Sequence, residues 1–201
     1  RDSTFSFVVP TEFVELPSEG DFYPEGHPLH GKASIEIKHM TAKEEDILTS
    51  ESLLRKGIAI ERLLQSLMVD KSIKLDDLLV GDKNALIVGA RITGYGPDYR
   101  THVSCPSCHS SQEAEFDLLD LENSKSALPE GVERSTEDTF FVPLPHSGIS
   151  VELRLLTGNE ERKYLSTSNR KRKKKLLESS TTDLLRLLIM SVDGYEDVES
   201  I

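Results

Sequence analysis

Residues 94–118 read GYGPDYRTHVSCPSCHSSQEAEFDL, and the spacing of the apolar residues changes within this stretch. Before it, apolar residues recur every three or four positions, which is typical of helices. Within it they alternate with polar residues on both sides of a short segment that holds Cys105 and Cys108. Such alternation around a turn predicts a β-hairpin whose tip carries the two cysteines. The alternating residues are Tyr99, Thr101, Val103, Ala114, Phe116 and Leu118.

The residues before the hairpin are predicted to form a helical unit over residues 40–94. Thr41 and Glu44 have the spacing of a capping box, in which the hydroxyl and the carboxylate satisfy free amides at a helix start. Apolar residues with a 3.6-residue period follow. Asp82 is expected to cap a further helix that ends near Gly94.

Residues 1–39 are predicted to be an extended arm that lies on a partner and ends in a short strand over residues 34–38. The stretch holds four prolines and three glycines. These residues interrupt regular structure, because proline lacks an N–H group and glycine readily adopts positive φ. The expected apolar anchors of the arm are Phe13, Leu16, Phe22 and Tyr23.

The rest of the chain is predicted to form a β-hairpin unit over residues 95–156, which includes the cysteine hairpin, and C-terminal helices over residues 157–201. Alternating residues flank the turn PHSG at 145–148, which indicates a second hairpin. A second capping-box pattern begins at Thr157, and an apolar stripe ending at Val192 predicts the last helix. The order of helices and hairpins, without internal repeats, predicts an α+β fold.

The composition limits the partners of this chain. It carries a net charge of −11, so bulk repulsion opposes binding to a phosphate backbone, and nucleic acid is not an expected partner. No apolar run reaches the roughly 18 residues of a membrane span. Two cysteines are too few for the disulfide framework of a small secreted protein. We therefore expect a soluble, acidic protein that is made in the cytoplasm.

The cysteine pair has three interpretations, which the sequence leaves open. Two thiolates at a hairpin tip suit two corners of a zinc tetrahedron, completed by histidines or shared between copies. The pair could equally belong to a degenerate ribbon without metal. A redox dithiol is disfavoured, because the strand-to-helix placement that lowers a thiol's pKa is absent. Zinc is the one cofactor considered, and its candidate ligands are Cys105, Cys108, His102 and His109.

Residues 170–175 read RKRKKK, a run of six cations on an acidic chain. The simplest interpretation is a solvated helix end, since cations are favoured at the C-terminal end of a helix dipole. An acidic protein neighbour is the second interpretation and nucleic acid the third.

No catalytic or cofactor-binding pattern is evident. The three adjacent acids Glu44, Glu45 and Asp46 lie at a predicted helix start, where capping explains them. No nucleophile elbow, phosphate loop or metalloprotease helix is present in the sequence. The chain is therefore not expected to be an enzyme.

Several segments in succession resemble the baseplate hub subunit family of T-even-type contractile-tailed bacteriophages. The resemblance covers residues 13–192, and TAKEEDIL and the block from GDKN to GYG are its most specific parts. The matching segments are LPSEGDFYPEGHPL at 16–29, IEIKHMTAKEEDILTSESLLRKG at 35–57, LLVGDKNALIVGARITGYG at 78–96, the CPSC pair with FDLLDL, and LPHSGISVELRLLTGNEE at 144–161.

The resemblance implies a structural or assembly protein of the phage tail baseplate without enzymatic activity. It implies other tail and baseplate proteins as partners, several copies per particle, and a place in the virion after assembly in the cytoplasm of the host bacterium. The alternative function is that of a zinc-ribbon-type adaptor in nucleic-acid transactions.

Overall fold

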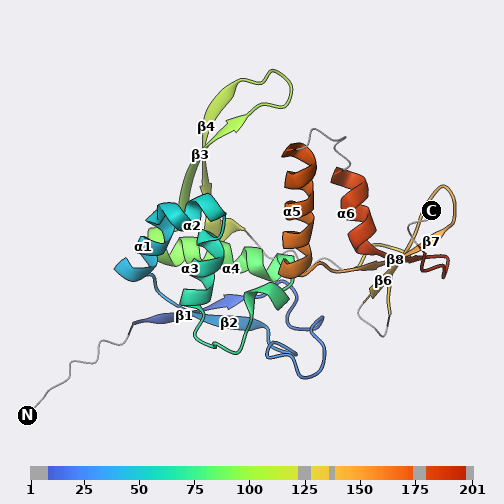
Figure 1. The fold of residues 1–201 in the computed structure, drawn as a ribbon, viewed down its shortest axis with the longest axis horizontal. Coiled ribbons are helices and arrows are strands. Elements are labelled where there is room, and N and C mark those ends of the chain that lie inside the picture. Colours follow the sequence, from blue (N-terminus) through green and yellow to red (C-terminus); the bar gives the residue numbers. More distant parts are fainter. Residues whose placement is uncertain (1–8, 122–127, 136–138, 174–179, 198–201) are drawn as a thin grey trace, which may run out of the picture. The chain divides into compact units, whose positions relative to one another are not determined.

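The computed structural model describes residues 9–121, 128–135, 139–173 and 180–197, without the side chains of 169–173 and 180. The chain divides into two compact units. Unit 1 comprises residues 1–75 and 81–124, and unit 2 comprises residues 76–80 and 125–201. Helices and small antiparallel sheets make up the described residues, which confirms the α+β class (Figure 1). The predicted segment 95–156 is divided, because its first hairpin lies in unit 1 and its second in unit 2.

Most helical residues belong to the middle of the chain. Their elements are α1 (Ala42–Thr49), α2 (Glu51–Lys56), α3 (Ala59–Leu67), the 3₁₀ turn η1 (Leu75–Asp77), α4 (Val80–Tyr95) and the 3₁₀ turn η2 (Leu118–Asp120). Helix α3 buries its apolar face, including Leu63, Leu64 and Leu67, in the core of unit 1. Helix α4 buries Leu86 and Ala90.

Two pairs of strands complete unit 1. β1 (Thr11–Glu15) pairs antiparallel with β2 (Ser34–Lys38), with Val14 opposite Ile35. β3 (Asp98–Ser104) pairs antiparallel with β4 (Ser111–Asp117), with Thr101 opposite Ala114. In Figure 1 the β3–β4 hairpin follows the end of α4.

The N-terminal region differs from the extended arm that we predicted. Between the two strands the chain forms successive turns that bury Leu16, Tyr23 and Leu29 in unit 1. Turns of this kind use the same prolines and glycines that exclude long regular elements. Of the predicted anchors, Leu16 and Tyr23 therefore serve the core of their own unit, whereas Phe22 is half-buried and Phe13 is exposed. Residues 1–8 of the predicted arm lie outside the described part of the chain.

A buried carboxylate holds these turns to helix α4. Asp82 accepts hydrogen bonds from the amide of Ser18 at 3.0 Å, the hydroxyl of Ser18 at 2.6 Å and the hydroxyl of Tyr23 at 2.6 Å. Asp82 was predicted as a helix cap, but α4 begins two residues earlier, at Val80. Its side chain is free to bind a distant segment because it lies inside the first turn rather than at the cap.

A second buried carboxylate organises the start of α1. Glu44 completes the predicted capping box with Thr41, and it also accepts hydrogen bonds from Lys38 at 3.0 Å and from Ser66 at 2.7 Å. Burial raises the pKa of Glu44, but the hydrogen bonds from Thr41, Ser66 and Lys38 outweigh burial and hold the pKa at about 2. One side chain thereby ties β2, α1 and α3 together.

Unit 2 is built around a four-stranded antiparallel sheet with the order β5-β6-β7-β8. Its strands are β5 (Glu133–Arg134), β6 (Thr139–Pro143), β7 (Ser150–Arg154) and β8 (Ile189–Val192), and its helices are α5 (Gly158–Lys173) and α6 (Ser180–Leu188). The predicted last helix was expected to continue to Val192, but α6 ends at Leu188 and the chain continues as a strand. Pairing of Val192 with Val151 on β7 explains the change, since a helix could not supply those hydrogen bonds.

A polar network joins three strands of this sheet. Glu152 on β7 accepts hydrogen bonds from Thr139 on β6 at 2.7 Å and from Ser191 on β8 at 2.8 Å. The hydrogen bond from Thr139, followed by that from Ser191, lowers the pKa of Glu152. The buried apolar side chains described in unit 2 are Leu78, Leu79 and Val151.

Removing the buried carboxylate of Asp82 should loosen the N-terminal turns. We expect Asp82→Ala to lower the free energy of unfolding by about 2–4 kcal/mol, because the donors of Ser18 and Tyr23 lose their acceptor. Tyr23→Phe, which removes one donor, should cost about 1 kcal/mol. Urea unfolding with hydrogen exchange over residues 16–33 measures both effects. Equal stability of Asp82→Ala and the unaltered chain would contradict this role.

The low pKa of Glu44 predicts a pH-dependent contribution to stability. Its folded pKa of about 2 lies below its ordinary value of 4.5, so the stabilisation is complete above about pH 4.5 and is lost as the pH falls toward 2. Glu44→Gln should lower stability by roughly 3 kcal/mol at pH 7, and the difference should shrink on acidification. Urea midpoints at pH 7, 4 and 2.5 test this. Asp46→Asn, an exposed acid of the same helix, is the control.

Candidate functional site

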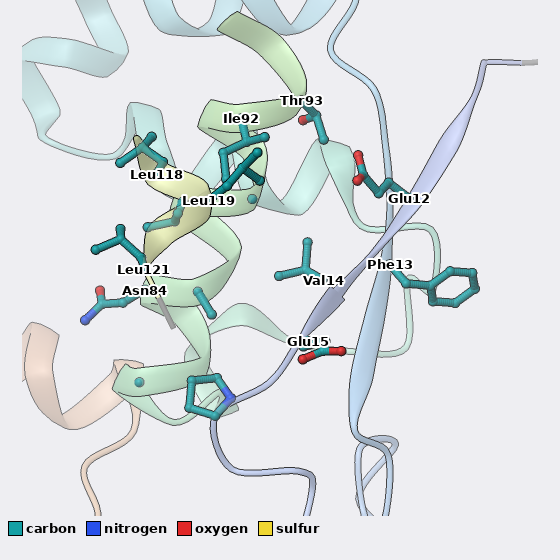
Figure 2. Close-up of a pocket in the computed structure, with 15 residues that line it drawn as sticks. Glu12, Phe13, Val14, Glu15, Asn84, Ile92, Thr93, Leu118, Leu119 and Leu121 are labelled. Carbon is teal, nitrogen blue, oxygen red and sulfur yellow. The ribbon is translucent and has the colours of Figure 1, made fainter. Parts of the chain in front are cut away.

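A groove of about 390 Å³ lies on the surface of unit 1. β1 forms one wall with Glu12 to Glu15, and α4 forms the other with Asn84, Val88 and Ile92 (Figure 2). Leu118, Leu119 and Leu121, which follow the β3–β4 hairpin, line the same groove. The groove therefore joins three segments that are far apart in the sequence.

A close approach of β1 to α4 sets the position of the groove. A Cβ atom at Gly89 of α4 would lie 2.5 Å from Cγ2 of Val14, so glycine permits this contact. Figure 2 shows Val14 pointing from β1 toward α4, whereas Phe13 points away from it. The Asp82 hydrogen bonds reinforce the arrangement, because they attach the turns after β1 to the first turn of α4.

The lining is largely apolar and open to solvent. Leu119 is 65% exposed and Leu121 is 59% exposed. Leu119 is held by the turn that begins at Asp117, whose carboxylate accepts a hydrogen bond from the amide of Leu119 at 2.9 Å. Ordered leucines in an open groove are typical of a surface that binds another chain.

The wall formed by β1 also presents unpaired backbone groups. The amide of Leu16 donates a hydrogen bond to the carbonyl of Ala33 at 2.8 Å. The amide of His39 donates one to the carbonyl of Pro10 at 2.9 Å. With the antiparallel register, these bonds place the even-numbered residues of β1 toward β2. The backbone groups of residues 11, 13 and 15 therefore point to the open edge, where no hydrogen bond to other described residues forms.

These features suit an extended peptide. An open strand edge can add a further strand through main-chain hydrogen bonds, and an adjacent apolar surface can take alternate side chains. The carboxylates of Glu12 and Glu15 lie on the same wall and favour a cationic segment. Among the described residues that line the groove, no nucleophile stands beside a base.

The cysteine pair lies at the tip of the β3–β4 hairpin. The turn is closed by hydrogen bonds from the Cys105 amide to the Ser110 carbonyl and from the His109 amide to the Cys105 carbonyl, each 2.9 Å long. The Ser110 hydroxyl lies 3.1 Å from Sγ of Cys108. Hydrogen bonds from the side chain and the amide of Ser110, and then from Cys105, lower the pKa of the Cys108 thiol. The turn thus places both cysteines at the tip of the hairpin.

The two candidate histidines do not join the thiols. His102 alternates with Val103, so it lies on the face of the hairpin opposite to Val103, and His109 is exposed beside Cys108. Within the described residues, no three His, Cys, Asp or Glu side chains form a metal-binding group. Two thiolates fit zinc in their chemistry, but a structural zinc ion needs four ligands. Zinc binding therefore stays a prediction, and it requires ligands beyond this pair.

Helix α5 includes the first four residues of the basic run, and residues 174–175 lie outside the described part of the chain. No helix among the described residues is both long and apolar enough to cross a membrane.

Comparison with known protein families, with curated proteins and with solved structures finds no match for this chain.

The backbone at His109 gives a test of its role. His109 has φ of 56°, a left-handed conformation that glycine adopts without strain. His109→Gly should stabilise the hairpin by about 1 kcal/mol, whereas His109→Ala should not. Amide exchange in β3 and β4 measures the difference. A hairpin that loosens in His109→Gly under zinc, and equally in His109→Ala, would instead identify the imidazole as a ligand.

Proposed function

We propose that this chain is a structural or assembly component of a contractile phage tail baseplate that binds neighbouring tail proteins in several copies per particle. The resemblance over residues 13–192 supports the baseplate assignment. The observation that carries the binding role is the apolar groove beside the open edge of β1. In this proposal the chain is assembled in the host cytoplasm and takes its place in the tail baseplate.

The groove receives an extended segment of a neighbouring tail protein. The segment pairs with the backbone groups of residues 11, 13 and 15 and places apolar side chains against Leu119 and Leu121. Cationic residues of the segment meet Glu12 and Glu15. Main-chain pairing supplies affinity, and the apolar and acidic walls supply specificity.

Unit 2 supports a role in assembly in a different way. Its described residues bury few apolar side chains, and several large ones are exposed: Phe141, Leu144, Leu165 and Leu185. A unit with a small core gains stability when a partner covers such side chains.

The charges of the β3–β4 hairpin give little support to the alternative function, a zinc-ribbon-type adaptor that contacts nucleic acid. Arg100 is the one Lys or Arg in the β3–β4 hairpin, and it pairs with Glu115 at 3.0 Å. An adaptor that contacts nucleic acid through the hairpin needs several cations on one face. The charge of this hairpin therefore gives no support to contact with nucleic acid through it.

Leu119→Glu should weaken the binding of the proposed partner while the chain stays folded. Leu119 is mostly exposed, so the change should alter stability by less than about 0.5 kcal/mol while placing a charge against an apolar segment. Association with tail proteins co-expressed from the same phage genome should fall at least about tenfold. Leu54→Glu, an exposed leucine of α2 outside the groove, is the matched control.

Sedimentation and pull-down of the co-expressed tail proteins measure the association. Cryo-electron microscopy of the unaltered complex should show an additional strand along β1. If Leu119→Glu and Leu54→Glu bind the tail proteins equally well, the groove is not the binding site. A chain that never associates with tail proteins would remove the baseplate function itself.

A further inference from the structure

The β3–β4 hairpin has one apolar and one polar face. Tyr99 pairs with Phe116 and Thr101 with Ala114, so these side chains lie on one face together with Val103. Tyr99 is 41% exposed, Phe116 48% and Val103 37%. The opposite face carries the pair of Arg100 and Glu115, as well as His102. An isolated two-stranded hairpin is marginally stable, and an uncovered apolar face indicates that another element packs on it.

The first thiol lies on the same face. Hydrogen bonding between Cys105 and Ser110 continues the β3–β4 register beyond its last strand residues. The alternation of side chains then places Cys105 on the side of Val103 and away from His102. Cys108 lies in the same turn, which the hydrogen bonds from the His109 amide to the Cys105 carbonyl and from the Cys105 amide to the Ser110 carbonyl close. An element that covers the apolar face therefore meets the thiols as well.

The tip of the hairpin is also free of fixed charge. Residues 103–112 read VSCPSCHSSQ and hold no Asp, Glu, Lys or Arg. The nearest acids on β4 are Glu113 and Glu115, and the pair Asp98 and Asp117 lies at the far end of the hairpin. Two tips can therefore approach each other although each chain carries a net charge of −11.

We propose that two copies of this chain join through their hairpin tips around one zinc ion, which is bound by Cys105 and Cys108 of each copy. Each copy supplies two of the four ligands that a structural zinc ion requires. The arrangement has two-fold symmetry, so the apolar face of one hairpin packs on the same face of the other. The histidines take no part in it, which agrees with the position of His102 on the polar face.

A second copy of this chain suits the hairpin surface better than a different protein does. One hairpin presents both a half-complete ligand set and an apolar face, and an identical hairpin complements both at once. Two histidines of the same chain would complete the metal site but leave the apolar face uncovered. This inference is independent of the baseplate function, since it requires this chain and zinc alone.

The first experiment measures zinc content and mass together. The full chain, kept reduced with a phosphine, is titrated with zinc and examined by sedimentation and by metal analysis. We expect one zinc ion per two chains in a dimer, and a monomer after removal of zinc with a chelator. Cys105→Ser and Cys108→Ser should each abolish zinc binding and the dimer. His102→Ala and His109→Ala are the matched controls and should retain both.

Three outcomes would overturn the proposal. One zinc ion per monomeric chain, lost in His109→Ala, would establish a site within the chain. A dimer that survives chelation would show a contact without metal. A reduced chain that retains no zinc would leave the thiols metal-free. Should the serine variants misfold, cobalt substitution of the unaltered chain still decides, because four thiolates and a mixed thiolate–imidazole set absorb differently; the mixed spectrum contradicts the proposal.

Discussion

The buried carboxylate of Asp82 is the interaction on which unit 1 depends. It joins the turns between β1 and β2 to the first turn of α4, across about sixty residues of sequence. A buried carboxylate needs several donors, and Ser18 and Tyr23 supply three hydrogen bonds between them. The same segments also meet where Val14 packs closely on Gly89. The Asp82 hydrogen bonds and this packing together hold β1 against α4, where the groove lies.

The two units are stabilised in different ways. Unit 1 combines an aliphatic core with two buried carboxylates, Asp82 and Glu44, each satisfied by several donors. In unit 2 the described residues bury few apolar side chains, and the partly exposed Glu152 joins three of the strands. A network of that kind specifies strand pairing, but it buries less apolar surface than an aliphatic core does. The exposed leucines of unit 2 are consistent with stabilisation by a neighbour in an assembly.

Unit 1 presents two surfaces with different chemistry. The groove offers an open strand edge, leucines and acids, which suit an extended cationic segment of another protein. The hairpin offers an apolar face and two thiols without fixed charge at its tip, which suit an identical hairpin and zinc. The two surfaces could act together in an assembly with several copies, since dimerisation would place two grooves in one particle and increase binding by avidity.

Local patterns in the sequence determined much of this protein: the capping box at Thr41 and Glu44, the strand over residues 34–38, and the CPSC turn were all visible there because they depend on near neighbours. The predicted extended arm was wrong over residues 16–33, and Val192 lies on a strand rather than a helix, because distant partners decide both. The role of Asp82 and the groove could not be foreseen, since Ser18, Val14 and Leu119 meet only after folding. Local hydrogen bonding follows from sequence; burial and open strand edges follow from which segments pack together.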